Sequence, residues 1–397
     1  MQLQLPRLRP DQWRIANHPA QIKVLVMGRR WGKTVMSGAV AMAYANAGAH
    51  VAWMAPTYKN SRPLWRWSEN TVAPLKRHGV EVSRAERVIQ FPTGGFLGVY
   101  SADNPDAIRG EAFHMVILDE AARIGEETWQ DAVQPTLADY NGRAILISTP
   151  KGKNWFFNEY IRAQNATAEL AAAFNAPTSD NPNPNIRRAA ELAKTRVPEM
   201  TYRQEWLAQF VEGGVVFRNV RELAKLQARE PEAGREYVIG ADWGRTNDYT
   251  VFVVFDVRSK QMCALERFTQ VDYPTQALRL EALAKRWNGA SVIAEYNSMG
   301  GPMIEEMQRR NLPVIAFTTT NASKTLVIDA LVRAFEFREI EILNDANLIT
   351  ELEAYASEPT ATGIKYGAPE GLHDDTVMAT ALGWHGLSKA PQGQLFF

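Results

Sequence analysis

Residues 24–34, VLVMGRRWGKT, form an apolar run that breaks into a short turn ending in Gly32, Lys33 and Thr34. A strand that stops at a glycine-bearing loop and continues as a helix points several free backbone N–H groups at one place, where a phosphate group fits. Lys33 would add positive charge toward the β- and γ-phosphates, and the Thr34 hydroxyl would ligate Mg²⁺. The stretch therefore predicts a Walker A loop that binds ATP and leads into a helix over residues 35–47.

This loop departs from the usual Walker A pattern, because Met27 stands where that pattern begins with glycine and the first glycine is Gly28. The positions that follow are Arg29, Arg30 and Trp31, which we include in the predicted nucleotide site. The two arginines are close enough to the turn for one of them to reach a phosphate of the same chain. The alternative is an ordinary strand–turn–helix corner with a solvated lysine.

The composition of the chain limits its class. Its 397 residues are too many for one compact core and fit two domains with a connection. The 44 basic and 44 acidic side chains cancel, so any basic groove for nucleic acid must be local. Cys263 is the single cysteine, which excludes an internal disulfide and fits a reducing compartment. No apolar run is long enough to span a bilayer, and we expect an intracellular protein without a membrane partner.

A second buried strand is predicted over residues 113–121, FHMVILDEA, where an apolar run ends in Asp119 and Glu120. In open α/β sheets ligands bind at the carboxyl ends of the strands. Asp119 would belong to the Mg²⁺ shell, and Glu120 would orient and polarise the attacking water. An acidic pair at a strand end can also simply cap the next helix, but combined with the Lys33 loop the pair favours an ATPase.

Two further features belong to this half of the chain. Residues 143–152 predict another strand that ends in Ser148, Thr149 and Pro150, polar groups placed to sense the γ-phosphate, or else a plain strand exit. Arg109 lies on a loop before the acidic pair and could project toward a neighbouring subunit as an arginine finger, with a surface salt bridge as the alternative.

The middle of the chain predicts a boundary. Proline and asparagine crowd residues 176–185, and residues 186–210 are charged and predicted to be helical. We therefore expect an ATPase domain over 1–175, a connector or lid over 176–235, and a second domain over 236–397.

The second domain predicts a new set of strands. Residues 237–243 form a strand that ends on Asp242, and residues 249–257 and 262–268 read as an antiparallel pair. A helix over about 275–287 leads to a strand that ends on Glu295. Carboxylates at strand ends are again predicted to meet at one edge of a sheet.

Two more acids open the last helix, at Asp374 and Asp375. Together with Asp242 and Glu295 they would supply the carboxylates that bridge two Mg²⁺ or Mn²⁺ ions about 3.5–4 Å apart in a phosphodiesterase. Neighbouring positions on a helix point about 100° apart, so one of the pair would be the direct ligand and the other would support it. Asp248 could assist from its loop. The alternative is three unrelated capping acids.

With these residues in hand, the chain resembles the large terminase subunit of tailed double-stranded DNA phages. The likeness runs nearly end to end and rests on an ordered set of short motifs: RPDQW (9–13), VMGRRWGKT (26–34), MAPTYKN (54–60), VILDEA (116–121), STPKG (148–152), the NPN connector, GADWG (240–244), AEYNSMG (294–300) and HDDTVMAT (373–380).

The resemblance implies a P-loop, helicase/RecA-like ATPase domain with a mainly parallel sheet, followed by an RNase H-like nuclease domain with a mixed sheet. It implies ATP-driven translocation of duplex DNA into a procapsid, coupled to metal-dependent cutting of concatemeric DNA. The implied partners are double-stranded DNA, the portal protein, the small terminase subunit and further copies in a ring. The implied location is the cytoplasm of the infected bacterial host.

The resemblance also assigns roles to single residues. These are Gln12 on adenine, Arg29 as a phosphate sensor in the variant loop, Glu120 as catalytic glutamate, Ser148, Thr149 and Pro150 as the coupling motif, Arg109 as a finger acting in trans, and Asp242, Glu295 and Asp374 as the nuclease triad with Asp375 adjacent.

The last residues raise a separate hypothesis. Gln392–Phe396, QGQLF, resembles a pentapeptide that binds the bacterial sliding clamp, and the alternative is a frayed terminus. The tail after Ser388 lacks the longer basic extension that some relatives of the family carry, so docking on the portal through such a tail is in doubt.

Three other functions are weighed against the packaging motor. They are a helicase-like DNA-remodelling ATPase with an inactive nuclease-fold domain, a non-catalytic DNA- or portal-binding module, and a transposase or integrase. The last shares the acidic triad but does not account for the N-terminal ATPase residues.

Overall fold

The computed structural model describes residues 3–211, 214–244, 248–296, 300–310, 312–360, 363–369 and 372–388. The chain divides into two compact units. The first comprises residues up to 195 together with 200–212 and 359–363, and the second comprises 196–199, 213–358 and the residues from 364 onward. The segment 176–235, expected as one connector, is thus shared between the two units.

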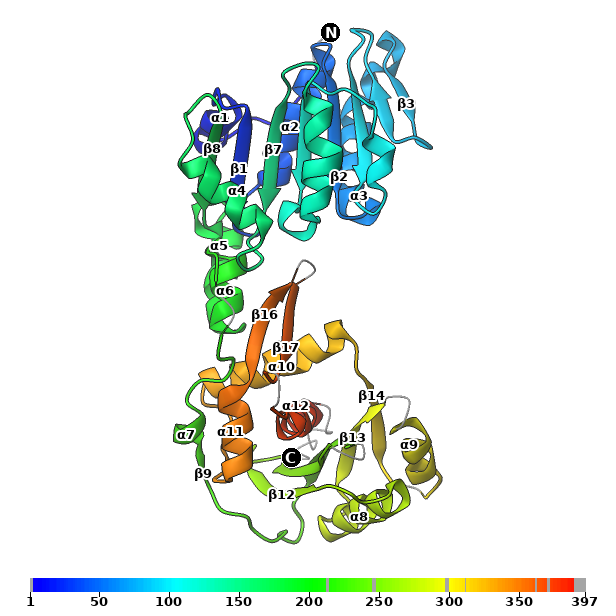
Figure 1. The fold of residues 1–397 in the computed structure, drawn as a ribbon, viewed down its shortest axis with the longest axis vertical. Coiled ribbons are helices and arrows are strands. Elements are labelled where there is room, and N and C mark those ends of the chain that lie inside the picture. The colour runs from blue at the N-terminus through cyan, green and yellow to red at the C-terminus, as the bar shows by residue number, and fades with distance from the viewer. Residues whose placement is uncertain are drawn as a thin grey trace, which may run out of the picture. The chain divides into compact units, whose positions relative to one another are not determined.

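The first unit is built on an eight-stranded sheet, shown in blue to green in Figure 1. In spatial order its strands are β3 (Glu81–Ser83), β4 (Val88–Gln90), β5 (Phe96–Ser101), β2 (His50–Ala55), β6 (Met115–Asp119), β7 (Arg143–Ser148), β1 (Ile22–Met27) and β8 (Ala171–Ala176). The strands from β5 to β8 run parallel, and β3 and β4 are antiparallel additions at one edge. The expected mainly parallel sheet is confirmed.

Continuous apolar strands require cover on both faces of a parallel sheet. One face packs against α2 (Lys33–Asn46) and α3 (Tyr58–Val72), with Met36, Trp53 and Leu64 in the shared core. The other face packs against α4 (Trp155–Gln164), with Phe156 in its core. A short helix, α1 (Pro10–Ala16), and 3-10 turns complete the unit. The carboxyl ends of the central strands are thereby left for a site.

The connector holds short helices rather than one long helix. α5 spans Pro184–Lys194, and α6 spans Glu199–Glu205. The prediction of continuous helix over 186–210 was wrong, because Pro198 lacks the N–H that a continuing helix needs and residues after Glu205 leave the helix. Beyond it lie α7 (Val220–Leu223) and β9 (Ala224–Leu226).

The second unit has a five-stranded mixed sheet in the order β12 (Met262–Phe268), β11 (Thr250–Asp256), β10 (Tyr237–Asp242), β13 (Ser291–Tyr296) and β14 (Val314–Thr318). β10, β11 and β12 are antiparallel, while β10, β13 and β14 are parallel. The expected mixed sheet is confirmed, as is the expected antiparallel pair β11–β12.

Helices cover both faces of this second sheet. α8 (Tyr273–Arg286) and α9 (Gly300–Arg309) pack on one face, and α10 (Asn321–Glu336), α11 (Ala346–Ala354) and α12 (Asp375–Leu387) lie on the other. Figure 1 draws α12 end-on, between the sheet and α10 and α11. Two short ladders complete the unit, β15 (Ile342–Leu343) with β9 and β16 (Ala356–Thr360) with β17 (Gly363–Gly367).

A close approach of α12 to the sheet fixes where its first residues lie. A Cβ atom added at Gly240 of β10 would stand 2.1 Å from the backbone oxygen of Ala379 in α12. Only glycine fits such a contact between backbones. The N-terminus of α12, with Asp374 and Asp375, is therefore held against the strand that ends on Asp242.

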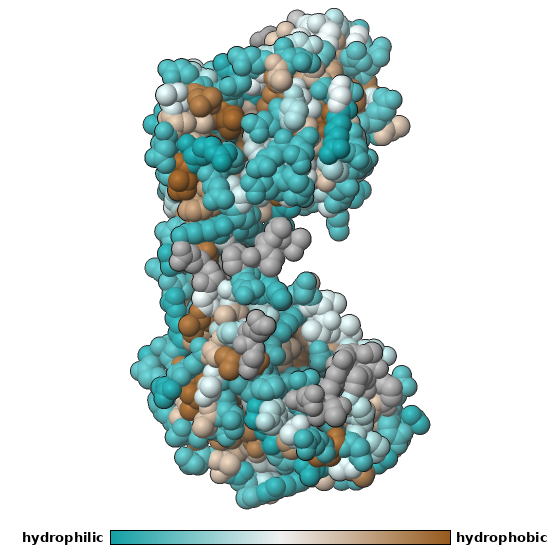
Figure 2. Space-filling model, viewed as in Figure 1, coloured by the Kyte–Doolittle hydropathy of each residue, from teal (hydrophilic) through white to brown (hydrophobic). Residues whose placement is uncertain are grey.

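The surface is polar on the side drawn in Figure 2, where hydrophilic residues predominate and apolar patches are scattered. Within the part of the chain that the structure describes, no helix combines the length and apolar character needed to cross a membrane.

Candidate nucleotide and metal sites

The predicted Walker A loop connects β1 directly to α2. Gly32 has a left-handed backbone with φ of 107°, which glycine adopts without strain, and α2 begins at the next residue, Lys33. The first N–H groups of a helix have no acceptor within it, so the first turn of α2 offers donors to an anion. Lys33 is buried and Thr34 is half-buried at this turn. The local geometry is that of a phosphate-binding loop.

The beginning of the loop is fixed by the segment after β8. The Gly28 N–H donates to the carbonyl of Ala176 at 2.9 Å, and a Cβ atom at Gly28 would lie 2.6 Å from the backbone nitrogen of Thr178. The Asn181 amide donates to the carbonyl of Arg30, whose own side chain is exposed. Trp31 packs into the core with 1% of its surface exposed, so its side chain supports the loop, and its part in nucleotide binding stays a prediction.

Gln12 is buried beside the same loop. Its amide oxygen accepts from the Arg9 N–H at 3.1 Å, and its amide nitrogen donates to the carbonyl of Gly32 at 3.3 Å. Arg9 donates to the carbonyl of Trp31 at 2.9 Å. These contacts tie α1 to the phosphate loop. Adenine recognition by Gln12 stays a prediction, and the described role of its amide is to position Gly32.

Arg29 makes an ion pair that the sequence did not indicate. Its Nε lies 2.6 Å from Glu205 of α6, and Lys151 Nζ lies 2.8 Å from the other carboxylate oxygen. Burial acts to raise the pKa of Glu205, but the charges of Lys151 and Arg29 outweigh burial and hold that pKa below its usual value. Glu205 therefore links the loop to the segment that follows β7. No sequence signal marks it, since it is one charge among many in its helix.

Replacing Glu205 with glutamine should destabilise the first unit by about 1–3 kcal/mol, because Lys151 and Arg29 lose a buried ionic partner. Urea unfolding followed by circular dichroism measures this change. Glu199→Gln on the same helix is the control, since Glu199 is exposed and its partner is the exposed Arg218. Equal stability of the two variants would contradict the structural role given to Glu205.

The acidic half of the site lies at the end of β6. Asp119 is 5% exposed, and its carboxylate accepts from the backbone N–H of Glu120 at 3.0 Å. Burial and the neighbouring Glu120 raise the pKa of Asp119 to about 7, against the opposing charge of Lys33. Lys33 and Asp119 therefore lie within each other's electrostatic field, as the predicted ATPase site requires.

Glu120 has an unusual backbone. Its φ of 54° is left-handed, which costs a non-glycine residue about 1 kcal/mol or more. Its side chain is about one quarter exposed and lies 3.8 Å from Arg123. Strain of this kind persists where the surrounding structure holds a residue in place, which agrees with a carboxylate aimed at a ligand.

The segment after β7 borders this corner. Ser148, Thr149 and Pro150 are all buried, and the Ser148 hydroxyl has no hydrogen-bond partner in the described part of the chain. β7 pairs with both β6 and β1, so the segment lies between the acidic strand end and the phosphate loop. Together with the hard oxygens of Thr34 and Asp119, the unpartnered hydroxyl fits a site for Mg²⁺ and phosphate.

Arg109 does not join this group. Its side chain is 57% exposed and pairs with Asp106 at 3.1 Å, just after a 3-10 turn. Its role as a finger toward another subunit stays a prediction.

The predicted nuclease acids meet at one edge of the second sheet. Asp242 ends β10, and Glu295 lies near the end of β13, the strand that pairs with it in parallel. Burial, then Glu295, Asp375 and Asp374 in that order, raise the pKa of Asp242 well above its usual value. Carboxylates from three separate segments therefore share one electrostatic field, and the alternative of unrelated capping acids is disfavoured.

Asp374 and Asp375 have different surroundings. Lys324 Nζ donates to the Asp374 carboxylate at 3.1 Å. One carboxylate oxygen of Asp375 is buried without a hydrogen-bond partner among the described residues, and Nδ1 of His373 lies 3.6 Å away, beyond hydrogen-bond distance. Burial and the charge of Glu351 raise the pKa of Asp375 to about 6. The unpartnered oxygen makes Asp375 a ready ligand.

A carboxylate that the sequence analysis missed supports this helix end. Glu351 of α11 accepts from the backbone N–H of Thr376 at 2.8 Å and pairs with Arg267 at 3.1 Å. The Arg267 guanidinium in turn lies over the ring of Tyr249 at 3.4 Å from its centre. Glu351 therefore caps α12 and fixes the position of the two aspartates before it.

Glu351→Ala should lower the stability of the second unit by about 3 kcal/mol or more, because Arg267 would keep a largely buried charge without its partner. Thermal and urea unfolding of the full chain measure the change. Glu353→Ala is the matched control on the same helix, since its pair with Arg221 is exposed to solvent and adds little stability. A loss in the control as large as in Glu351→Ala would refute the capping role.

The acidic edge of the second sheet is also a candidate metal site. Among the described residues, no three His, Cys, Asp or Glu side chains converge tightly enough to form a closed ion site. The side chains nevertheless suit divalent cations, because they offer the hard carboxylate oxygens that such ions prefer. One of these oxygens has no hydrogen-bond partner, and the neighbouring carboxylates repel one another. Asp248 is exposed, and its assisting role stays a prediction.

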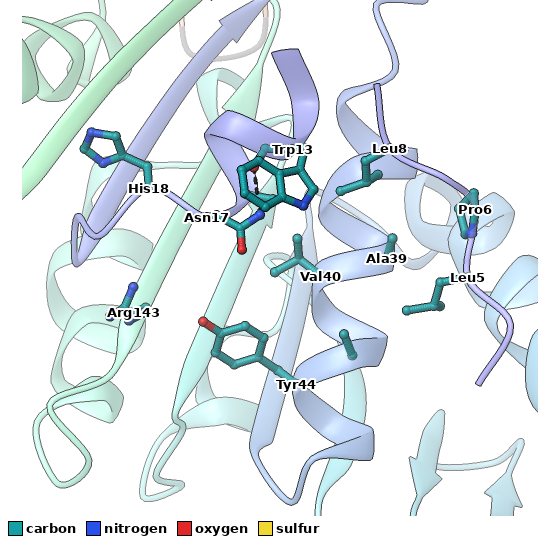
Figure 3. A pocket seen from close by; sticks show the side chains of 12 residues that line it. Leu5, Pro6, Leu8, Trp13, Asn17, His18, Ala39, Val40, Tyr44 and Arg143 are labelled. Carbon is teal, nitrogen blue, oxygen red and sulfur yellow. Dashed lines mark hydrogen bonds between the residues drawn. The ribbon is translucent and has the colours of Figure 1, made fainter. Parts of the chain in front are cut away.

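A cavity of about 340 Å³ lies in the first unit, between α1, α2 and the N-terminal segment (Figure 3). Trp13 covers it and Val40 and Tyr44 form its floor. Tyr44 follows Lys33 by eleven residues of helix, which corresponds to about 16 Å. The cavity is therefore not the phosphate site.

Two protein classes follow from these sites. A strand–loop–helix phosphate loop facing an acidic strand end on a mainly parallel sheet defines a P-loop nucleotide hydrolase. A mixed sheet that gathers carboxylates at the ends of two parallel strands and the start of a helix is the arrangement of an RNase H-like nuclease.

Family models match both units. The model described as "Terminase large subunit, T4likevirus-type, N-terminal" matches residues 24–223, and the "Terminase RNaseH-like domain" model matches residues 239–385. The chain belongs to the family of terminase large subunits, and the resemblance drawn from its motifs is confirmed.

Individual relatives agree. The chain is 28% identical over 423 aligned positions to the terminase large subunit of Thermus phage G20c, covering 95% of this chain and 87% of the relative. It is 26% identical over 237 positions to that of Escherichia phage T5, covering 56% and 53%. A large terminase from a thermophilic bacteriophage superposes with a TM-score of 0.62 at 16% identity, covering 95% of this chain and 98% of that one, which shows a common fold.

Proposed function

We propose that this chain is the motor and nuclease of a DNA-packaging machine. It hydrolyses ATP to move double-stranded viral DNA into a procapsid, and it cuts concatemeric DNA in a metal-dependent reaction. The observation that carries the proposal is the presence of two acidic strand-end sites in one chain, Asp119 beside Lys33 and Asp242 among three further carboxylates.

In the ATPase site, Lys33 and the N–H groups at the start of α2 bind the phosphates, and Glu120 orients and polarises the attacking water. Thr34 and Asp119 would hold Mg²⁺, which supplies charge neutralisation on the phosphate oxygens when bound. The contacts of Glu205 with Arg29 and Lys151 support a phosphate-sensing role for Arg29. A movement of the Arg29 side chain would be passed through Glu205 to Lys151, in the segment after Ser148.

In the nuclease site, Asp242, Glu295 and the Asp374–Asp375 pair would hold two Mg²⁺ or Mn²⁺ ions. These ions supply water activation and stabilise the leaving oxygen when bound. The fold positions these carboxylates, because Asp242 is buried at the end of its strand and Glu351 fixes the helix that carries the aspartate pair.

The proposed partners are double-stranded DNA, a portal protein, a small terminase subunit and further copies of the chain in a ring, with Arg109 as the residue acting in trans. The proposed location is the cytoplasm of an infected bacterial host, since the relatives belong to bacteriophages. Clamp binding by Gln392–Phe396 is a separate prediction that lies outside the described residues.

A second candidate is a helicase-like DNA-remodelling ATPase whose nuclease-fold domain is inactive. The observation that favours it is that the described residues form no closed three-ligand metal site.

A packaging assay separates the two candidates. Procapsids bearing the matching portal are mixed with DNA, ATP and the chain, and DNA protected from added nuclease is measured. The wild type and Asp242→Ala should protect linear DNA, and Lys33→Ala should protect none. Plasmid nicking with Mn²⁺ should be lost in Asp242→Ala and retained in Lys33→Ala. Absence of nicking by the wild type would favour the remodelling ATPase.

A further inference from the structure

Lys324 lies at the same edge of the second sheet as the carboxylates. It is in the first turn of α10, which begins shortly after β14 and is capped by Thr320. Its Nζ lies 3.1 Å from the Asp374 carboxylate, and its side chain is 24% exposed. A lysine so placed brings a full positive charge to a group of acids.

Two other basic groups near these acids have different surroundings. Arg267 forms an ion pair with Glu351, with 3.1 Å between its guanidinium nitrogen and a carboxylate oxygen. His373 lies 3.6 Å from Asp375, beyond hydrogen-bond distance. Lys324 differs from both, because it donates a hydrogen bond directly to one of the four clustered carboxylates.

A buried hydroxyl belongs to the surroundings of this pair. Lys324 Nζ lies 5.9 Å from the centre of the Tyr355 ring. Tyr355 is completely buried, and its hydroxyl has no hydrogen-bond partner in the described structure. The charges of Asp374 and Asp242 act on this hydroxyl, after burial itself, to raise its pKa. The Tyr355 hydroxyl is therefore a second polar group that lies within the electrostatic field of these acids, close to Lys324.

We propose that Lys324 is a built-in competitor of the divalent metal at the nuclease site. Its ammonium group compensates the carboxylate charge in the metal-free protein, and metal loading must displace it from Asp374. This inference rests on the proposed nuclease function. The observation behind it is that one oxygen of Asp374 already accepts a hydrogen bond from Lys324.

The consequence for metal affinity has a definite sign. A cation that already neutralises part of the site weakens the attraction for a second cation, and the effect is large at short range where solvent is partly excluded. Removing the charge of Lys324 should strengthen metal binding. If Lys324 instead helped to position the metal, removing its charge would weaken metal binding.

The test is Mn²⁺ binding to the full chain by isothermal titration calorimetry, without DNA or nucleotide. Lys324→Met should bind Mn²⁺ at least about tenfold more tightly than the wild type. Lys324→Arg keeps the charge and should bind like the wild type. Lys285→Met removes a charge from α8, where the lysine pairs with Glu281, and should also bind like the wild type. Circular dichroism in EDTA checks that each variant is folded.

Asp242→Asn identifies which of the measured Mn²⁺ belongs to the nuclease site, since that component should disappear. Equal or weaker binding by Lys324→Met would overturn the role of Lys324 while leaving the nuclease intact. If no variant shows Mn²⁺ binding that Asp242→Asn removes, both the proposed nuclease and the role of Lys324 fall.

Discussion

Glu120→Gln should abolish ATP hydrolysis, lowering the rate by about 10³-fold, while nucleotide affinity stays within a few-fold of the wild type. The reason is that nucleotide binding and water activation depend on different residues of the site. Lys33 and the N–H groups of the loop bind the phosphates, whereas Glu120 is the partly exposed carboxylate left to orient the water. Phosphate release and binding of a fluorescent ATP analogue measure the two quantities.

The assay includes DNA and portal-bearing procapsids, because an arginine acting in trans is supplied only by an assembled ring. Glu126→Gln, an exposed glutamate shortly after the site, is the matched control and should hydrolyse ATP normally. Lys33→Ala should instead lose affinity. Turnover by Glu120→Gln at the rate of the wild type would place the water-orienting group elsewhere.

Asp242→Asn should abolish Mn²⁺-dependent nicking of plasmid DNA by about 10³-fold or more and leave ATP hydrolysis unchanged. Asparagine keeps the shape of the side chain but removes the carboxyl group that acts together with Glu295, Asp374 and Asp375. The metal-free second unit should not lose stability, because burial and the neighbouring acids already oppose ionisation of Asp242. Gel analysis of supercoiled and nicked plasmid measures the activity.

Asp345→Asn is the control for that experiment. Asp345 caps α11 by accepting from the N–H groups of Asn347 and Leu348, and asparagine caps equally well. It should cut like the wild type, without sequence preference on naked DNA, since phosphate contacts and metals read no sequence. Nicking that survives in Asp242→Asn, or a defined cleavage site, would contradict the proposed nuclease.

Much of the fold could be predicted because its signals are local. The change from an apolar run to a glycine turn at residues 24–34 predicts a strand, a loop and a helix, and β1 and α2 lie there. Apolar runs that end on Asp119 and Asp242 predict buried strands with acids at their carboxyl ends, and β6 and β10 have this form.

Other features depend on partners that are distant in the sequence. Glu205, Glu351 and Lys324 look like ordinary surface charges on helices, and only the folded chain brings them to Arg29, Arg267 and Asp374. Trp31 sits inside a phosphate loop in the sequence but packs into the core. Local composition indicates helix over 186–210, while Pro198 breaks it.

The central claim is that one chain holds two separate sites for metal and phosphate. Its most direct test is diffraction from crystals soaked in Mn²⁺ and a non-hydrolysable ATP analogue, with anomalous scattering to locate manganese. We expect the analogue at residues 28–34 with one ion beside Thr34 and Asp119, and two ions at Asp242, Glu295 and the Asp374–Asp375 pair. A nucleotide bound elsewhere, or no manganese peak at these carboxylates, would contradict the claim.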